Sequence, residues 1–175
     1  MLRFKQFIPA GFCLKCQVCC RFPERPTAWQ PRLTREEISA FKNRRAFKGN
    51  LAKGAIKLKA LGSFFCCAFF NRKKNSCKIY RLRPLDCRLY RFILISRQRK
   101  IFLAAHLACP FVTENIRSKK FKRHIGYLKR VFAKRDIRAF IKTNPAIIQD
   151  YQNYRQASPT SVWRELIPLF SVSHR

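Results

Sequence analysis

A run of four cysteines near the start of the chain limits what it can fold into more than any other feature. The run consists of Cys13, Cys16, Cys19 and Cys20, with the spacing C-x2-C-x2-C-C. Two intervening residues allow two thiolates to converge on one metal ion or cluster while the backbone turns around it. The spacing therefore predicts metal ligation by the first three cysteines. The side chain of Cys20 projects differently from that of its neighbour, so Cys20 can serve the same centre or a second one.

Five more cysteines follow between residues 66 and 109. Cys66 and Cys67 are adjacent, Cys77 and Cys87 flank the segment KIYRLRPLD, and Cys109 stands before a proline. Nine cysteines exceed by one the number that two four-coordinate sites would use. Either Cys66 or Cys67 is therefore the expected spare, as a buried thiol on an apolar strand.

The chain carries an excess of positive charge that implies an acidic partner. Lys and Arg number 39 against 8 acidic residues, for a formal charge of +31. Repulsion on this scale destabilises a compact state unless anions offset it. Nucleic acid, anionic lipid, an acidic protein or anionic metal–thiolate centres can do so, but one tetrathiolate centre carries only about −2. Metal binding alone thus offsets a small part of the excess.

The cellular compartment bears on how the cysteines are used. No segment approaches the roughly 20 apolar residues that span a bilayer, and the first residues lack the apolar stretch of a secretion signal. We therefore expect a soluble, cytoplasmic protein. A reducing compartment disfavours stable disulfides and favours thiolate metal ligation.

Local patterns predict an α+β fold that is small and irregular near the metal. Glycine and proline around the first cysteines indicate loop rather than long helix. Thr34 followed by Glu37 is typical of a capping box and predicts a short helix of about 8–12 residues. Weak alternation within 49–62 indicates a strand with Ile56, Leu58 and Ala60 on one face.

The later part of the chain gives clearer signals. The apolar segments 92–95 and 101–104, separated by SRQRK, predict a hairpin. Apolar residues at helical spacing predict one long or two consecutive amphipathic helices up to Thr143, ended by Pro145. A further helix is predicted over 162–169. We expect a cysteine-cluster domain over 1–112, followed by a basic helical extension over 113–175 that packs on it.

Four segments together resemble a known family. They are CLKCQVCCR from Cys13, LTREEI, CAFF from Cys67 and CKIYRLRPLDCR from Cys77, and the similarity runs to about residue 110. The chain thus resembles the CxxCxxCC cysteine-cluster family, also called the YkgJ-type zinc- or iron-chelating domain. The resemblance aligns the Cys-x-Phe pattern with Cys67, which makes Cys66 the extra cysteine, and aligns Cys109 with a late Cys-Pro.

The resemblance implies a metal-binding protein that holds zinc or iron, including as an iron–sulfur cluster. It implies eight ligands, which are Cys13, Cys16, Cys19, Cys20, Cys67, Cys77, Cys87 and Cys109. Arg83 and Arg88 lie beside these cysteines in sequence, where a guanidinium can lower a thiol pKa and donate to sulfur. Arg83 can equally pair with Asp86 or cap a turn that Pro84 stiffens.

Other chemistry finds little support in the sequence. With five glycines the chain contains no phosphate-binding glycine motif, and its few acidic residues show no pairing for acid–base catalysis, so no reaction is assigned. His106 can replace one thiolate, although a single histidine in an apolar stretch is more often structural. The run SKKFKRHIGYLKRVFAKR suits phosphate contacts and base stacking, or is a solvated helix face whose aromatic residues are core. A basic nucleic-acid or ribosome-associated module with structural zinc is therefore the alternative function.

Overall fold

A computed structural model describes residues 2, 4–16, 20–22, 27, 29–150 and 166–172 of the chain. It divides into two compact units, Met1–Arg88 and Leu89–Arg175. Each unit combines helices with strands, and the longer helices belong to the second unit, which confirms the α+β prediction. The expected division at residue 112, into a cysteine-cluster domain and a helical extension, stays a prediction.

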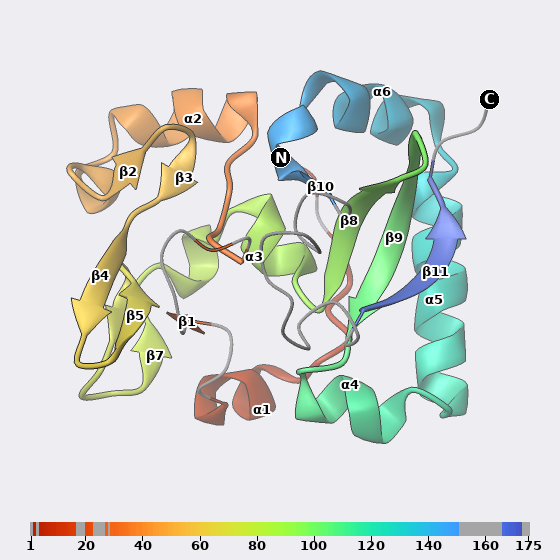
Figure 1. Cartoon of the computed structure of the whole chain (residues 1–175), viewed down its shortest axis with the longest axis horizontal. Helices are drawn as coiled ribbons and strands as arrows, with labels where there is room; N and C mark the ends of the chain where they lie inside the picture. Colours follow the sequence, from red (N-terminus) through yellow and green to blue (C-terminus); the bar gives the residue numbers. More distant parts are fainter. Residues whose placement is uncertain are drawn as a thin grey trace. The chain divides into compact units, whose positions relative to one another are not determined.

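The first unit is made of short elements around small sheets (Figure 1). A three-stranded antiparallel sheet has the order β1-β5-β4, and two small hairpins pair β2 with β3 and β6 with β7. Its elements are α1 (Ala10–Lys15), β1 (Arg21–Phe22), α2 (Arg35–Lys42), η1 (Arg45–Phe47), β2 (Leu51–Ala52), β3 (Ala55–Ile56), β4 (Leu58–Leu61), β5 (Phe64–Cys67), β6 (Phe70–Asn71), β7 (Ser76–Cys77), η2 (Tyr80–Leu82) and α3 (Leu85–Leu89).

The predicted capping box is present at the start of α2. Thr34 Oγ1 accepts from the Glu37 N–H at 3.2 Å, and Glu37 Oε2 accepts from the Thr34 N–H at 3.1 Å. The helix is eight residues long, within the predicted range. Its buried Phe41 stacks on Phe47 with ring centroids 4.1 Å apart, in an apolar core that also contains Phe69.

The structure refines two sequence predictions in the first unit. The segment of the first cysteines, expected to be loop rather than long helix, contains the six-residue helix α1, which includes Cys13. The single strand expected within 49–62 is three short strands, since Lys53 and Gly54 adopt positive φ and reverse the chain between β2 and β3. Of the three residues expected on one strand face, Ile56 and Leu58 are buried, whereas Ala60 is exposed.

The second unit is a four-stranded sheet with helices (Figure 1). The sheet order is β10-β8-β9-β11, in which β10 runs parallel to β8 and the other pairs are antiparallel. Aromatic rings of α5 contact both β8 and β11, through Phe92 with Phe121 and Phe132 with Phe170. Its elements are β8 (Phe92–Arg97), β9 (Lys100–His106), α4 (Pro110–Asn115), α5 (Lys119–Phe132), α6 (Arg135–Thr143), η3 (Pro145–Ile147), β10 (Ile148–Asp150) and β11 (Leu166–Ser171).

The hairpin and the consecutive helices predicted up to Thr143 are confirmed. β8 and β9 pair around a two-residue turn in which Gln98 and Arg99 both have positive φ, the geometry that matches strand twist. The helices α5 and α6 follow each other in the chain, and α6 ends at Thr143, before Pro145. No described helix is long and apolar enough to cross a membrane.

The helix predicted over 162–169 is wrong where the structure describes it. Residues 162–165 lie outside the described part, and Leu166–Ser171 forms the edge strand β11 against β9. Pro168 lies at the start of a register irregularity, between Pro168 and Phe170. Proline cannot donate to a ladder, and an edge strand with an irregular register accommodates it.

Candidate metal centre

Cys20 and Cys67 lie opposite each other in the sheet of the first unit. β1 pairs with β5 so that Arg21 faces Cys66 and Phe22 faces Phe65. The pairing extends one residue further, because the Cys67 N–H donates to the Cys20 carbonyl oxygen at 3.0 Å. Residues opposite each other on adjacent strands share one face of the sheet. The Cys20 and Cys67 thiols are therefore on the same side.

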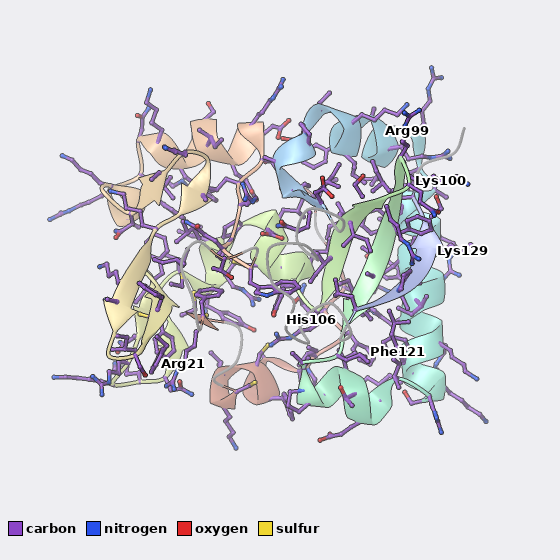
Figure 2. The ribbon with its side chains drawn as sticks, viewed as in Figure 1. Arg21, Arg99, Lys100, His106, Phe121 and Lys129 are labelled. Atoms are coloured by element: carbon purple, nitrogen blue, oxygen red, sulfur yellow. The ribbon has the colours of Figure 1, made fainter. Side chains whose placement is uncertain are left out.

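Cys66 belongs to the other face of the same strand. Successive residues of a strand point to opposite faces, so Cys66 is separated from Cys67 although they are neighbours in sequence. The cross-strand neighbours of Cys66 are Arg21 and Lys59, both basic. Arg21, labelled in Figure 2, also lies over the rings of Phe64 and Phe70, at 5.4 Å from each centroid.

Two thiols accept backbone hydrogen bonds from nearby in the chain. The N–H of Phe69 donates to the Cys67 sulfur, and the N–H of Ile79 donates to the Cys77 sulfur, in each case from two residues further on. The two turns lie side by side, since the Lys78 N–H donates to the Phe69 carbonyl oxygen at 2.9 Å. A hydrogen bond to sulfur stabilises the thiolate that metal ligation requires.

The Cys87 thiol brings a fourth segment to this neighbourhood. It belongs to α3, where the residue is half-buried, and removal of the thiol from water raises its pKa well above the usual range. The nearby Asp86 carboxylate and the thiols of Cys67, Cys20 and Cys77 raise the pKa of Cys87 further. The Cys87 thiol thus interacts electrostatically with three other cysteines of the first unit.

Burial also governs the other thiols of this group. It raises the pKa of Cys67 to about 12, and it raises the pKa of Cys77. The Ile79 N–H and the Arg83 guanidinium oppose the shift of the Cys77 pKa. Without a cation these thiols stay protonated at neutral pH. A bound metal ion supplies the positive charge that deprotonates them.

Arg83 is held by Tyr80 rather than by the carboxylate that sequence reasoning offered as a partner. Its Nε donates to the Tyr80 carbonyl oxygen at 3.1 Å, and its guanidinium lies 3.8 Å from the Tyr80 ring centroid. Asp86 instead accepts from the Arg32 N–H at 2.9 Å. Because Arg83 lowers the pKa of Cys77, its position agrees with a role beside the thiols.

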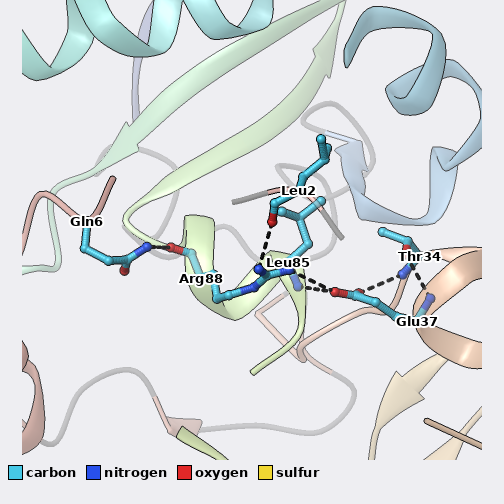
Figure 3. A network of polar contacts seen from close by, with 6 residues as sticks. All are labelled: Leu2, Gln6, Thr34, Glu37, Leu85 and Arg88. Carbon is cyan, nitrogen blue, oxygen red and sulfur yellow. Dashed lines mark hydrogen bonds and ion pairs between the residues drawn. The ribbon is translucent and has the colours of Figure 1, made fainter. Parts of the chain in front are cut away.

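Arg88 is engaged by a carboxylate and by the start of the chain (Figure 3). Its Nη2 lies 3.4 Å from Glu37 Oε1, and its Nη1 donates to the Leu2 carbonyl oxygen at 2.8 Å. The Arg88 carbonyl oxygen accepts from Gln6 Nε2 at 3.0 Å. The side chain predicted to act beside the thiolates therefore anchors the segment that contains Cys87.

For the other predicted ligands that it describes, the structure shows the element or unit to which each belongs. Cys13 is in α1 and Cys16 follows its last residue. α1 contacts β7, and Asn75, the residue before β7, donates from Nδ2 to the Lys15 carbonyl oxygen at 3.3 Å. Cys19 lies outside the described residues. Cys109 is buried in the second unit, immediately before α4.

His106 also belongs to the second unit. Its Nδ1 lies 3.0 Å from the Tyr90 hydroxyl oxygen. Burial, with a smaller contribution from Arg91, lowers the pKa of His106 to about 4.

The donor chemistry fits zinc or iron, but the described thiols are not drawn together as ligands of one ion. Thiolate sulfur is a soft donor that suits zinc and iron–sulfur centres. Within the described part of the chain, no group of three or more Cys, His, Asp or Glu side chains is arranged to hold a metal ion. Metal binding would thus need closer approach of the thiols, as expected where binding is coupled to folding.

Comparison with known proteins bears on this arrangement. A family model matches residues 12–110, a range that contains all nine cysteines. The chain belongs to the CxxCxxCC family. That family is described as "Putative zinc- or iron-chelating domain", which supports metal binding in general terms. No curated protein and no solved structure matches this CxxCxxCC chain.

Sequence reasoning missed two contributions to this site. The hydrogen bonds from Phe69 and Ile79 to sulfur depend on tight turns after Cys67 and Cys77, and the hydrophobic residue two positions after each cysteine was their only trace in the sequence. The second contribution is Glu37, which the capping pattern identified without indicating its contact with the Cys87 segment.

Proposed function

We propose that the first unit binds zinc or iron through a thiolate centre that includes Cys20, Cys67, Cys77 and Cys87. One observation carries the proposal, which is the placement of Cys20 opposite Cys67 across β1 and β5. The electrostatic interaction of the Cys87 thiol with Cys20, Cys67 and Cys77 agrees with it. Buried ionisable groups gathered in this way are typical of functional sites. The hydrogen bonds to the sulfur atoms of Cys67 and Cys77 support the same reading.

The other predicted ligands would complete the metal-binding set. Cys13 and Cys16 lie on or next to α1, which contacts β7 and so approaches Cys77. Cys19 and Cys109 are proposed on the family pattern. Eight thiolates suffice for two four-coordinate zinc ions or two four-iron clusters. An iron–sulfur centre remains a proposal, since thiolates accept either metal.

Metal analysis beside an absorption spectrum of protein kept free of oxygen tests this proposal. Iron with sulfide and a broad band near about 400 nm would identify an iron–sulfur centre. A colourless protein with about two zinc ions per chain would identify zinc thiolate sites instead. Protein prepared with both metals available that retains neither would contradict the proposal.

Replacing Cys87 by Ser tests the named centre. We expect this variant to lose metal and stability together, because the binding free energy of such sites is also folding free energy. Metal content equal to that of the wild-type protein would exclude Cys87 as a ligand. Replacement of the exposed Ser39 by Cys adds a thiol on α2, far in sequence from the cysteine motifs, and it should leave the metal content unchanged.

A second candidate function rests on the basic surface of the second unit. Lys122, Arg123, Lys129 and Arg130 are exposed along α5, and Asp136 is the one acidic residue within 117–142. Figure 2 shows Lys129 directed outward, as are Arg99 and Lys100 at the β8–β9 turn. The exposed Lys119 lies three and four residues before Lys122 and Arg123. Like charges at these spacings destabilise a helix, and a polyanion would remove that repulsion. We propose that this face binds the phosphate backbone of nucleic acid.

The contacts of α5 decide which form of nucleic-acid binding is proposed. Phe121 and Phe132 are buried and face rings of the sheet, so they are core residues and do not stack on bases. Among the described residues, the large apolar side chains that are exposed lie outside α5 and α6, so these helices offer no apolar face for insertion into a membrane. The form of nucleic-acid binding that we propose is therefore contact with phosphates, without base stacking.

A salt titration of binding to a labelled RNA duplex tests this second candidate. One variant replaces Lys122, Arg123, Lys129 and Arg130 by Gln, and a matched control replaces the exposed Lys42, Arg44, Arg45 and Lys48 of the first unit. Both lose four positive charges. We expect the first variant to lower the log–log salt slope by about 3 to 4, and the control to change it little. Equal effects in both would show that net charge alone drives binding, and would contradict a dedicated face.

A further inference from the structure

Glu37 has a contact that its role as a helix cap does not require. The capping box uses one carboxylate oxygen, Oε2, which accepts from the Thr34 N–H. The other oxygen, Oε1, accepts from the Leu85 N–H at 2.6 Å and lies 3.4 Å from Nη2 of Arg88. Glu37 is only 2% exposed, so both oxygens need partners from the protein. One buried carboxylate therefore joins α2 to α3 (Figure 3).

The two residues that Oε1 contacts are the first and fourth of a five-residue helix. A helix this short is unstable in isolation, because few hydrogen bonds offset the cost of its first turn. Cys87 lies between the two contacts in sequence. Its preceding residue, Asp86, is held independently by the Arg32 N–H at 2.9 Å. Residues on both sides of Cys87 thus contact the segment 32–37, through the backbone at Leu85 and through side chains at Asp86 and Arg88.

The same network reaches the beginning of the chain. Arg88 Nη1 donates to the Leu2 carbonyl oxygen at 2.8 Å, and Gln6 Nε2 donates to the Arg88 carbonyl oxygen at 3.0 Å. Arg88 therefore joins Glu37 to the N-terminal segment that precedes the first cysteines. A guanidinium is well suited to this task, because it donates in several fixed directions at once.

We propose that Glu37 is a positioning residue of the metal centre, which fixes the direction of the Cys87 thiol through Leu85 and Arg88. The inference rests on the proposed function, in which Cys87 is a metal ligand. Thiolates bind a metal ion more tightly when their backbone is already fixed, because less conformational freedom is lost on binding. Glu37 does not touch the metal in this proposal. It contributes by limiting the positions that Cys87 can take.

Glu37→Gln separates this role from helix capping. Glutamine at this position still completes a capping box, so α2 keeps its N-terminal hydrogen bonds. Its amide has one acceptor oxygen in place of two, and it therefore cannot serve Thr34 on one side and the Leu85–Arg88 pair on the other. Glu36→Gln is the matched control, since Glu36 is the exposed neighbour in the same helical turn and loses the same charge.

Cobalt(II) added to the full-length, metal-free chain gives the readout. In four-coordinate thiolate sites the sulfur-to-cobalt absorption scales with the number of thiolates, so loss of one of four lowers it by about one quarter. We expect Glu37→Gln to show this loss and to release cobalt to a chelator at least about tenfold faster. Glu36→Gln should match the wild-type protein in both measurements, and circular dichroism should show that both variants keep their helix content.

The outcomes separate this inference from the proposed function. A wild-type protein that binds no cobalt, zinc or iron would contradict the proposed function itself. Wild-type binding with an unchanged cobalt spectrum and release rate in Glu37→Gln would overturn the positioning role and leave the metal centre intact. If Glu37→Gln does not fold, Arg88→Gln serves instead, because it keeps the capping box and the Leu85 contact. Arg88→Gln should then speed cobalt release, and an unchanged rate would overturn the proposal.

Discussion

The backbone N–H of Cys67 donates to the carbonyl oxygen of Cys20 at 3.0 Å, which places the two cysteines opposite each other across β5 and the start of β1. This register separates Cys67 from its neighbour. Cys66 lies opposite Arg21 and Lys59, whereas Cys67 lies opposite Cys20. The Cys67 thiol interacts electrostatically with Cys20 and Cys77, and less strongly with Cys66. Strand alternation therefore distinguishes two cysteines that composition and spacing left equivalent.

The register predicts opposite results for serine at these two positions. Cys67→Ser should lower the metal content and the affinity by about tenfold or more, because it removes a ligand. Cys66→Ser should retain metal close to the wild-type level and lose only packing, since both side chains are similar in size. Metal analysis and chelator competition on the two purified variants measure the difference. Greater metal loss from Cys66→Ser would reverse the assignment.

The raised thiol pKa values predict how stability depends on pH at the alkaline end. Burial raises the pKa of Cys67 from 9.0 to about 12 and also raises the pKa of Cys87. Between pH 9 and 12 the unfolded chain loses these protons while the folded, metal-free chain keeps them, so folding stability falls as pH rises. Each such thiol contributes a slope of about 1.4 kcal/mol per pH unit.

Metal should abolish this alkaline loss, because the ligands are then thiolates in the folded state. The metal-bound protein should instead lose stability as pH falls and protons compete for sulfur. Urea denaturation of both forms from pH 7 to 10.5 measures the two slopes. The same downward slope in both forms would argue against thiolate ligation by these residues.

Sequence patterns were sufficient where the structure depends on neighbours along the chain. Thr34 and Glu37 specify a helix start through contacts within one turn, and the polar residues between two apolar segments specify the β8–β9 hairpin. The strand at Leu166–Ser171 was missed because it forms by pairing with β9, about sixty residues earlier in the chain. Periodicity within a segment carries no information about such a partner.

The candidate site follows the same division. The spacing of Cys13, Cys16 and Cys19 indicated metal, and family resemblance named the other cysteines. The neighbourhood of Cys87 could not be inferred from spacing, because it is set by the β1–β5 register and by the buried contacts of Glu37. Those contacts join residues 48 and 51 positions apart. Long-range placement of this kind requires the folded chain.

A test of the second unit concerns pH at the acidic end. Burial lowers the pKa of His106 from 6.5 to about 4, with a smaller contribution from Arg91. Between pH 6.5 and 4, His106 is protonated in the unfolded chain but stays neutral in the folded chain. Its contribution to the free energy of unfolding is therefore full above pH 6.5 and falls as pH decreases. Burial also lowers the pKa of His124 to about 4, so this residue adds a similar slope.

His106→Gln should reduce this acidic slope while it lowers the stability at pH 7.5, where the contact between the ring and Tyr90 is lost. The loss at pH 7.5 should be about 1 kcal/mol or more. Denaturation at pH 5 and 7.5 measures both effects, and Tyr90→Phe serves as the control, since it removes the hydrogen bond but keeps the histidine. An unchanged slope in His106→Gln would mean that other groups titrate there.

The capping box of α2 offers a final prediction that links helix stability to the metal centre. Thr34→Ala removes the hydroxyl that accepts from the Glu37 N–H and should destabilise the protein by about 1 kcal/mol. Because Glu37 keeps its bond from the Thr34 N–H and its contacts with Leu85 and Arg88, the cobalt release rate should stay close to that of the wild-type protein. Ser118→Ala at the start of α5, whose hydroxyl accepts from the Phe121 N–H at 3.0 Å, is a control of equal size in the second unit. Faster cobalt release in Thr34→Ala alone would mean that the start of α2, and not the Glu37 carboxylate by itself, holds the Cys87 segment.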